Sequence, residues 1–124
     1  MTQSILITGA SSGFGLLTTH QLIAQGHRVV ATMRDPQGRN ASHAKALTDA
    51  GANVVAMDVT QDDSVSQAVD AVLDHFNGRL EVVVNNAGLG VVGLQECFTV
   101  DDWKRVFDVN VFGVARVNRA VLPT

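Results

Sequence analysis

A glycine-rich segment near the start of the chain, residues 9–15, has the residue types that bind phosphate groups. It lies between an apolar run, residues 4–7, and a predicted helix over residues 14–25. Glycines at such a turn let the backbone approach a ligand closely, and the N–H groups that open a helix favour an anion. The G-x-x-x-G-x-G spacing predicts a site for the phosphates of a dinucleotide, with these cofactor-binding residues: Gly9, Ser11, Ser12, Gly13, Phe14 and Gly15.

The same segment also matches G-x-S-x-G, the motif that presents a nucleophilic serine on a turn between a strand and a helix. Ser11 would be the nucleophile, and Asp58 and His75 follow it in the order that a hydrolase triad needs. However, the turn follows the first predicted strand, so nothing upstream could supply the second oxyanion donor. Phosphate binding is therefore the favoured interpretation.

One polar residue interrupts an apolar stripe on the last predicted helix, residues 99–122. The stripe has helical spacing and comprises Trp103, Val106, Phe107, Val111, Val114, Val117 and Val121. Asn110 lies on the same face, which we expect to be buried, and a buried amide without partners costs about 1–3 kcal/mol. From its residue type alone, Asn110 either bonds neighbouring backbone or has a function.

Strand-like and helix-like segments alternate along the chain. We predict strands over residues 4–7, 28–33, 53–57 and 82–85 and helices over residues 14–25, 41–50, 60–77 and 99–122. Two helix starts carry the signature of a capping box, Thr60 with Asp63 and Thr99 with Asp102. Alternating strands and helices imply parallel pairing through right-handed crossovers. The prediction is an α/β fold with a doubly wound parallel sheet, about four strands and four helices, in a single domain over residues 1–124.

Composition excludes several classes of function. Nine Lys and Arg against twelve Asp and Glu give a net charge of −3, too mild for a nucleic-acid partner or an anionic membrane surface. No apolar run approaches the length of a membrane span, and the N-terminus does not resemble a signal peptide, so we expect a cytoplasmic protein. Cys97 is the only cysteine, and the four histidines lack ligand spacing, so we expect neither a disulfide nor a metal site.

Four motifs resemble those of the short-chain dehydrogenase/reductase family. Residues 8–15 match its T-G-x-x-x-G-x-G motif and residues 85–88 its N-N-A-G motif. Residues 57–59 resemble its D-V segment, and residues 109–113 its V-N-x-x-G region. The motifs occur in the family's order and cover essentially the whole chain, which therefore resembles the N-terminal part of a family member.

The resemblance implies a Rossmann-like sheet and hydride transfer between NADP(H) and a small alcohol or carbonyl substrate. It implies that Asp58 bonds the adenine amino group and that Asn110 is catalytic, positioning a water in a proton relay. The cofactor-binding residues that it implies after the third and fourth strands are Asp58, Val59, Asn85, Ala87 and Gly88.

The resemblance also shows which catalytic residues the chain does not contain. Family members carry a catalytic Ser and a Tyr-x-x-x-Lys further along, whereas these 124 residues include no tyrosine. We therefore expect a domain truncated before those residues, and an isolated chain that is inactive and prone to self-association through the open edge of its fourth strand. The full-length form is expected to be a homo-oligomer. A non-catalytic nucleotide-binding or interaction module is the alternative.

The residues after the second strand bear on the choice of cofactor. Arg34 could pair with a 2′-phosphate through its planar guanidinium, which favours NADP(H). Asp35 is the competitor, because an acid at this place could bond the ribose of NAD(H) or simply pair with Arg34. NADP(H) is the predicted cofactor, and NAD(H) remains possible.

Overall fold

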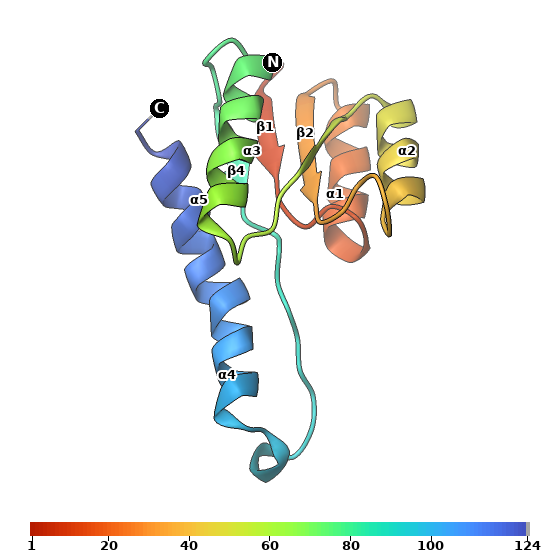
Figure 1. Cartoon of the computed structure of the whole chain (residues 1–124). Coiled ribbons are helices and arrows are strands. Elements are labelled where there is room, and N and C mark those ends of the chain that lie inside the picture. The colour runs from red at the N-terminus through yellow and green to blue at the C-terminus, as the bar shows by residue number, and fades with distance from the viewer. Residues whose placement is uncertain (124) are drawn as a thin grey trace.

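The computed structural model of the chain describes residues 1–123, in which four parallel strands form one sheet (Figure 1). The strands are β1 (Ser4–Ile7), β2 (Arg28–Met33), β3 (Asn53–Ala56) and β4 (Val82–Val84). Their order across the sheet is β3-β2-β1-β4. Because β1 and β4 are neighbours although far apart in sequence, their carboxyl ends lie side by side.

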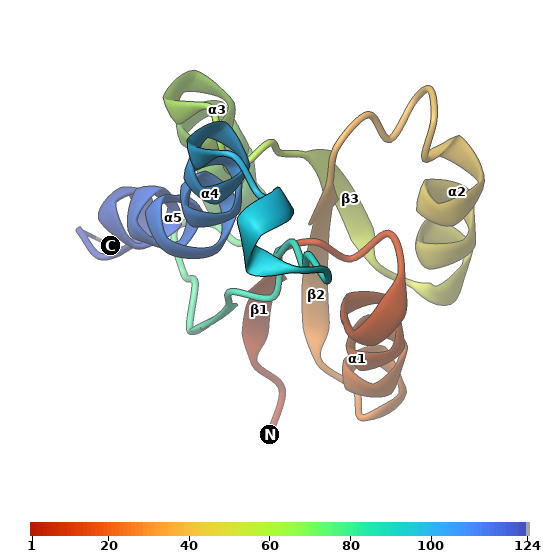
Figure 2. The same ribbon diagram turned by 90° about the horizontal axis from the view of Figure 1, so that it is seen from below.

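Helices cover both faces of this sheet. They are α1 (Gly13–Ala24), α2 (Ala41–Ala50), α3 (Asp62–His75), α4 (Val100–Phe107) and α5 (Gly113–Val121), with a π-helical turn, Asp108–Phe112, between the last two. Figure 2 shows α1 and α2 on one side of the sheet and α3 and α5 on the other. The predicted doubly wound parallel sheet is confirmed.

Two apolar clusters hold these layers together. Adjacent strand residues point to opposite faces of a sheet, so Leu6 and Val30 pack toward α3 and α5, whereas Ile7 and Ala31 pack toward α1 and α2. The predicted apolar stripe of the third helix is buried in the first cluster, with Val65, Ala68, Val69, Val72 and Phe76. Burial on both faces accounts for the apolar strands without alternation.

One of the two predicted capping boxes is correct and the other is wrong. Thr99 accepts from the backbone N–H of Asp102, whose carboxylate in turn accepts from the N–H of Thr99. The third helix begins later than predicted, at Asp62, and Gln61 is its N-cap. Thr60 does not cap it, because its hydroxyl donates to Oδ1 of Asp58 at 2.7 Å.

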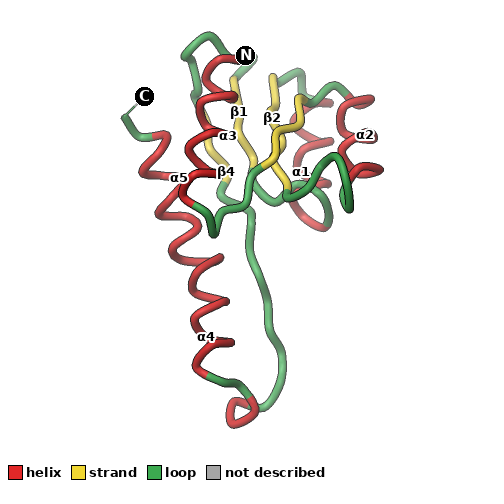
Figure 3. Tube along the Cα trace, in the orientation of Figure 1, coloured by secondary structure: helices red, strands yellow, loops and turns green. Residues whose placement is uncertain are grey.

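The last helix differs most from the prediction. It contains the π-helical turn, and α4 extends beyond the sheet beside the long loop that follows β4 (Figure 3). The apolar stripe is consequently exposed along α4, where Trp103 is 49% exposed, and buried along α5, where Val117 is 0% exposed. The expectation that Asn110 lies on a buried face is wrong. Asn110 is exposed, in the π-helical turn between α4 and α5.

The packing predicts unequal costs for two leucine truncations. Leu47 of α2 is 0% exposed, whereas Leu17 of α1 is 66% exposed. We expect Leu47→Ala to lower the free energy of unfolding by about 2–5 kcal/mol, because it removes buried methyl groups and leaves a cavity. Leu17→Ala should change it by less than about 1 kcal/mol. Urea denaturation measures both, and equal losses would contradict this assignment of the core.

Candidate functional site

A cavity of about 820 Å³ opens at the carboxyl ends of the four strands. Its walls come from the glycine-rich turn after β1, from the segments after β2, β3 and β4, and from α4 and the π-helical turn. Ligand sites in open parallel sheets lie at this edge, and their volumes fall in this range. The cavity is therefore the candidate site.

Thr8 and Asn86 join the turn after β1 to the segment after β4. The Thr8 hydroxyl accepts from the backbone N–H groups of Asn86, at 3.1 Å, and Ala87, at 3.0 Å. In return, Nδ2 of Asn86 donates to the carbonyls of Thr8 and Gly9, at 3.1 and 3.0 Å. Backbone groups that have left the sheet ladder thus find partners, and two walls of the cavity are held together.

Gly9 occupies a position that no larger residue could fill. Its φ is +65°, and a Cβ built on it would lie 2.6 Å from the Cα of Ala87. The turn after β1 and the segment after β4 therefore touch backbone to backbone. Any side chain here would separate the two walls that Thr8 and Asn86 join.

The N-terminus of α1 faces the cavity. Ser11, Ser12 and Phe14 line it, while Gly13 begins the helix and Gly15 is buried in its first turn. The first N–H groups of any α-helix have no partner within the helix, and the helix dipole adds partial positive charge at this end. This wall can therefore bind an anionic group.

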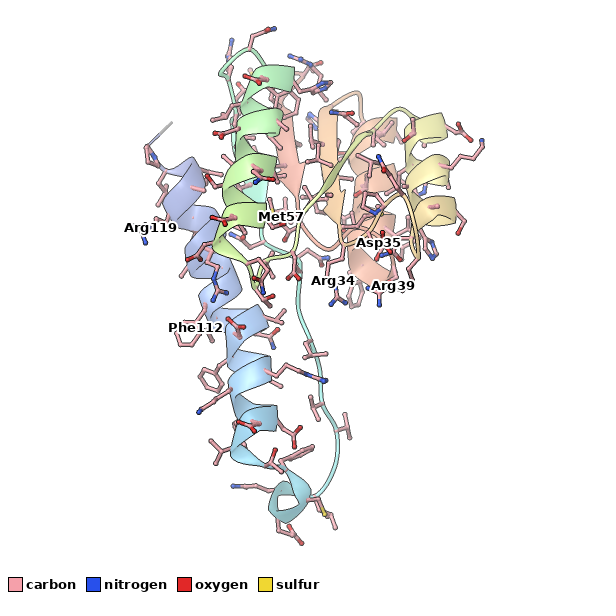
Figure 4. The ribbon with its side chains drawn as sticks, viewed as in Figure 1. Arg34, Asp35, Arg39, Met57, Phe112 and Arg119 are labelled. Carbon is pink, nitrogen blue, oxygen red and sulfur yellow. The ribbon has the colours of Figure 1, made fainter. Side chains whose placement is uncertain are left out.

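Two arginines from the loop after β2 line the cavity. Figure 4 shows Arg34 and Arg39 projecting from this loop at the same end of the sheet. Asp35, between them in sequence, adopts a φ of +47° and its carboxylate accepts from the backbone N–H of Arg39 at 2.8 Å. The Asp35 carboxylate therefore closes its own loop and is not among the residues that line the cavity.

Asp58 lines the cavity at the end of β3, and its ionised form is stabilised. Partial burial raises the pKa of its carboxyl group, but hydrogen bonds from the hydroxyl and backbone N–H of Thr60 oppose this. The positive charges of Arg34 and Arg116 act in the same direction as Thr60. The net result is a pKa below the usual value of an aspartate, so this wall presents a negative oxygen acceptor.

The side chain of Asn110 is fully engaged by one neighbour. Its Oδ1 accepts from the backbone N–H of Leu89 at 2.7 Å, and its Nδ2 donates to the carbonyl of Leu89 at 2.8 Å. Leu89 and Val109 line the cavity, whereas Asn110 does not. Of the two roles considered for Asn110 from the sequence, bonding to backbone is the one that these two hydrogen bonds show.

Asn85 also lies outside the cavity. Its Nδ2 donates to Oδ1 of Asn118 on α5, at 2.9 Å. The predicted site residues that the structure brings together around the cavity are Gly9, Ser11, Ser12, Phe14, Arg34, Asp58, Val59, Ala87 and Gly88. Gly13, Gly15, Asn85 and Asn110 are not among its lining residues.

Several lining residues were missed by the sequence analysis. Asn86 lies inside the N-N-A-G motif, so its position in the sequence was a usable signal, whereas its bonds to Thr8, which does not itself line the cavity, were not predictable. Arg39 lies in a polar segment without periodicity, so the sequence does not predict which way its side chain points. Arg105 lines the cavity from α4. Only the placement of α4 across the site brings it there.

The hydrolase triad does not assemble. Ser11 follows the carboxyl end of β1, whereas His75 ends α3 near the amino ends of the strands. There its carbonyl accepts from Arg28, the first residue of β2, and its ring packs edge-on against Phe76. Ser11 and His75 are therefore at opposite edges of the sheet.

Residues 1–123 contain neither a membrane-spanning helix nor a cluster of metal ligands. In this part of the chain, no helix is long and apolar enough to cross a membrane. Nor do three or more His, Cys, Asp or Glu residues there form a group that could hold a metal ion.

Comparison with protein families finds that the short chain dehydrogenase model matches residues 3–124. Among curated proteins, the chain is 41% identical over 121 residues to the 3-ketodihydrosphingosine reductase of Bacteroides thetaiotaomicron, covering 98% of this chain and 41% of that protein. It is 39% identical to human retinol dehydrogenase 8, covering 98% and 39% respectively. The chain thus spans less than half the length of these two curated relatives.

Solved structures share the fold. The NADPH-bound carbonyl reductase from chicken fatty liver superimposes with a TM-score of 0.90 at 30% identity, covering 98% of this chain and 51% of that one. The 3-ketoacyl-(acyl-carrier-protein) reductase from Brucella melitensis, complexed with NADH, gives a TM-score of 0.87 at 34% identity, covering 98% and 49%. Homologues with this fold therefore bind NADPH or NADH.

The bonds between the cavity walls predict that the Thr8 hydroxyl is more important than that of another buried threonine. Thr8→Val keeps the shape of the side chain but leaves two backbone N–H groups without their acceptor, so we expect a loss of about 1–3 kcal/mol in the free energy of unfolding. Thr19→Val is the matched control, since the Thr19 hydroxyl only donates to the helical carbonyl of Gly15. Denaturant titration compares them, and a larger loss for Thr19→Val would refute the proposed role of Thr8.

The pKa of Asp58 predicts a pH dependence. Because that pKa is lower in the folded chain than its usual value of about 3.9, ionised Asp58 stabilises the fold. Its contribution is fully present above the unfolded pKa and is lost as the pH falls through the folded pKa. Carboxyl NMR titration should show a lower Asp58 midpoint in the folded chain than in the unfolded chain, and Thr60→Val should raise the folded midpoint by removing one hydrogen bond. Identical midpoints in the two chains would count against the Thr60 contribution.

Proposed function

The chain belongs to the short-chain dehydrogenase family, and we propose that its cavity binds NADP(H) for hydride transfer with an alcohol or carbonyl substrate. The family consists of NAD(P)-dependent oxidoreductases, and this chain corresponds to their N-terminal, cofactor-binding region. A nicotinamide cofactor supplies the hydride when bound. The protein's own part is to bind and orient that cofactor.

The observation that carries the choice of NADP(H) is the arrangement after β2. An NAD(H) site needs a free carboxylate at this place for the ribose hydroxyls. Asp35 is the nearest candidate, and its carboxylate is used by the backbone N–H of Arg39. Arg34 and Arg39 meanwhile line the cavity, and guanidinium groups suit a 2′-phosphate.

The charges around the cavity support the same proposal. Arg34, Arg39 and Arg105 line it, whereas of its two carboxylates Asp108 is paired with Arg116 and Asp58 accepts from Thr60 through Oδ1 alone. The N-terminus of α1 adds partial positive charge. A dinucleotide with an additional phosphate is the anion that such a cavity suits.

The remaining walls accommodate the other parts of the dinucleotide. We assign the pyrophosphate to the turn formed by Ser11, Ser12 and the start of α1, as the family resemblance implies. Asp58 uses Oδ1 for both bonds from Thr60, which leaves its second carboxylate oxygen to accept from the adenine amino group. Ala87 and Gly88 are small enough to lie beside the cofactor.

The substrate and the complete reaction belong to the whole protein. The relatives are named for reducing 3-ketodihydrosphingosine and for oxidising retinol, so an alcohol or carbonyl is the substrate class that we propose. The family resemblance implies a tyrosine as proton donor, and these 124 residues contain none. We also propose self-association of the whole protein, because Val100, Trp103 and Phe107 expose apolar surface on α4.

A non-catalytic nucleotide-binding module is the second candidate, because the side chains around the cavity suit binding of a dinucleotide by themselves. The coding sequence after residue 124 separates the two functions. A strand that bears a serine, followed by Tyr-x-x-x-Lys, would establish the oxidoreductase. A stop codon at that point would establish the module.

Cofactor selectivity tests the proposal directly. We expect Arg34→Ala to weaken NADPH binding by about 1.5–3 kcal/mol, the scale of a hydrogen bond to a charged group, and to leave NADH binding nearly unchanged. Arg39→Ala should act in the same direction. Arg119→Ala, an exposed arginine on α5, is the matched control and should change neither affinity. Calorimetry measures all three variants, and equal losses for NADPH and NADH would rule out a 2′-phosphate contact.

A further inference from the structure

Arg116, in the first half of α5, bonds three separate parts of the fold. Its Nε donates to Oδ1 of Asp62, at the start of α3, at 2.9 Å. Its Nη1 donates to the carbonyl of Val59, after β3, at 3.0 Å and to the carbonyl of Asp108 at 3.1 Å, and its Nη2 donates to Oδ1 of Asp108 at 2.6 Å. The Arg116 side chain is 23% exposed, and its bonds to Val59 and to Asp108 are partly buried, whereas Asp62 is exposed.

Two of these bonds hold the first residue of the π-helical turn. In that turn the backbone N–H of Gly113 reaches back to the carbonyl of Asp108, five residues earlier. Arg116 bonds the same carbonyl and also the Asp108 carboxylate. A π-helical turn is a rare and local widening of a helix. Arg116 thus supplies side-chain bonds at the residue where the widening begins.

The bond to Val59 places the turn against the end of β3. Val59 lines the cavity, and its side chain packs against Gly113, where a Cβ would lie 2.8 Å from Cγ2 of Val59. Only a glycine permits this approach. The turn and the cavity wall are therefore in direct contact, with the Arg116 guanidinium bonded to both.

The π-helical turn also holds the segment around Leu89, which lines the cavity. Asn110 lies within this turn and bonds both backbone polar groups of Leu89, and its neighbour Val109 lines the cavity. We propose that Arg116 is a positioning residue, which fixes the π-helical turn on β3 so that Asn110 holds the Leu89 segment against the cofactor cavity. Its effect on cofactor affinity rests on the proposed function, whereas its effect on Leu89 does not.

The residue type suits this role. A guanidinium is a planar fork with five N–H donors, so it can bond two carbonyls and two carboxylates at once, whereas a lysine offers one compact ammonium group. Asp108 and Asp62 are the carboxylates that pair with it, and the hydrogen bond that Arg116 donates to Asp108 raises the pKa of Arg116. Arg119, three residues further along α5, projects away from the sheet and offers a matched control (Figure 4).

The first test uses the chain without any ligand. Amide hydrogen exchange by NMR should show that Arg116→Ala accelerates exchange of the Leu89 N–H about tenfold, while the Val30 N–H in the sheet keeps its rate. Arg116→Lys should fall between the two, and Arg119→Ala should match the wild type. Equal rates at Leu89 in Arg116→Ala and Arg119→Ala would overturn the proposal. So would equal acceleration at Leu89 and Val30, which would mean that Arg116 supports only global stability.

The second test measures NADPH affinity by calorimetry. We expect Arg116→Ala to weaken binding about tenfold and Arg119→Ala to leave it within about twofold. Unaltered affinity in Arg116→Ala would overturn the link to the cavity. A wild-type chain that binds no NADPH would contradict the proposed function, while Leu89 exchange still decides the role of Arg116. Should Arg116→Ala not fold, Asp108→Asn replaces it, because it weakens the bond between Arg116 and the residue 108 side chain and keeps the shape of that side chain. Exchange of the Leu89 N–H must then accelerate.

Discussion

The paired bonds between Thr8 and Asn86 are the interaction on which the candidate site depends. Parallel strands end with backbone groups that no longer have ladder partners, and here the segments that follow β1 and β4 both line the cavity. The Thr8 hydroxyl and the Asn86 amide satisfy those groups across the gap, so the walls are joined at the point where the sheet stops joining them. Gly9 permits this because its backbone touches that of Ala87.

The opposite side of the cavity is held by charge rather than by a hydroxyl. Arg116 connects β3, α3 and the π-helical turn, and it does so with a guanidinium that is mostly buried. A buried charge is tolerated only when it is paired and hydrogen-bonded, which Asp108 and two carbonyls provide. As a result the Asp108 carboxylate is paired within the protein, whereas Arg34 and Arg39 line the cavity and can meet an anionic ligand. The cavity therefore favours an anion, because the charge of Asp108 is paired with Arg116 while Arg34 and Arg39 line the cavity.

Much of the fold could be predicted from the sequence. The strands and the helix over residues 41–50 were placed within a residue or so, because apolar runs and helical stripes report burial directly. The errors arose where side chains had competing partners. Thr60 has the right type and spacing to cap α3, but it bonds Asp58 instead. Asp35 could have faced a ribose, yet its carboxylate bonds the N–H of Arg39.

The sequence by itself determined the alternation of strands and helices, the glycine turn and the motifs that identify the family, because these depend on residue type and on contacts close in the chain. Tertiary structure decided what each polar side chain does. Asn110 and Asn85 carry no mark of their partners, Leu89 and Asn118, which lie 21 and 33 residues away in sequence. Likewise, Arg105 reaches the cavity and Trp103 stays exposed only because α4 extends past the sheet. The physical reason is that hydrogen-bond partners and burial are properties of three-dimensional neighbours, which periodicity does not specify.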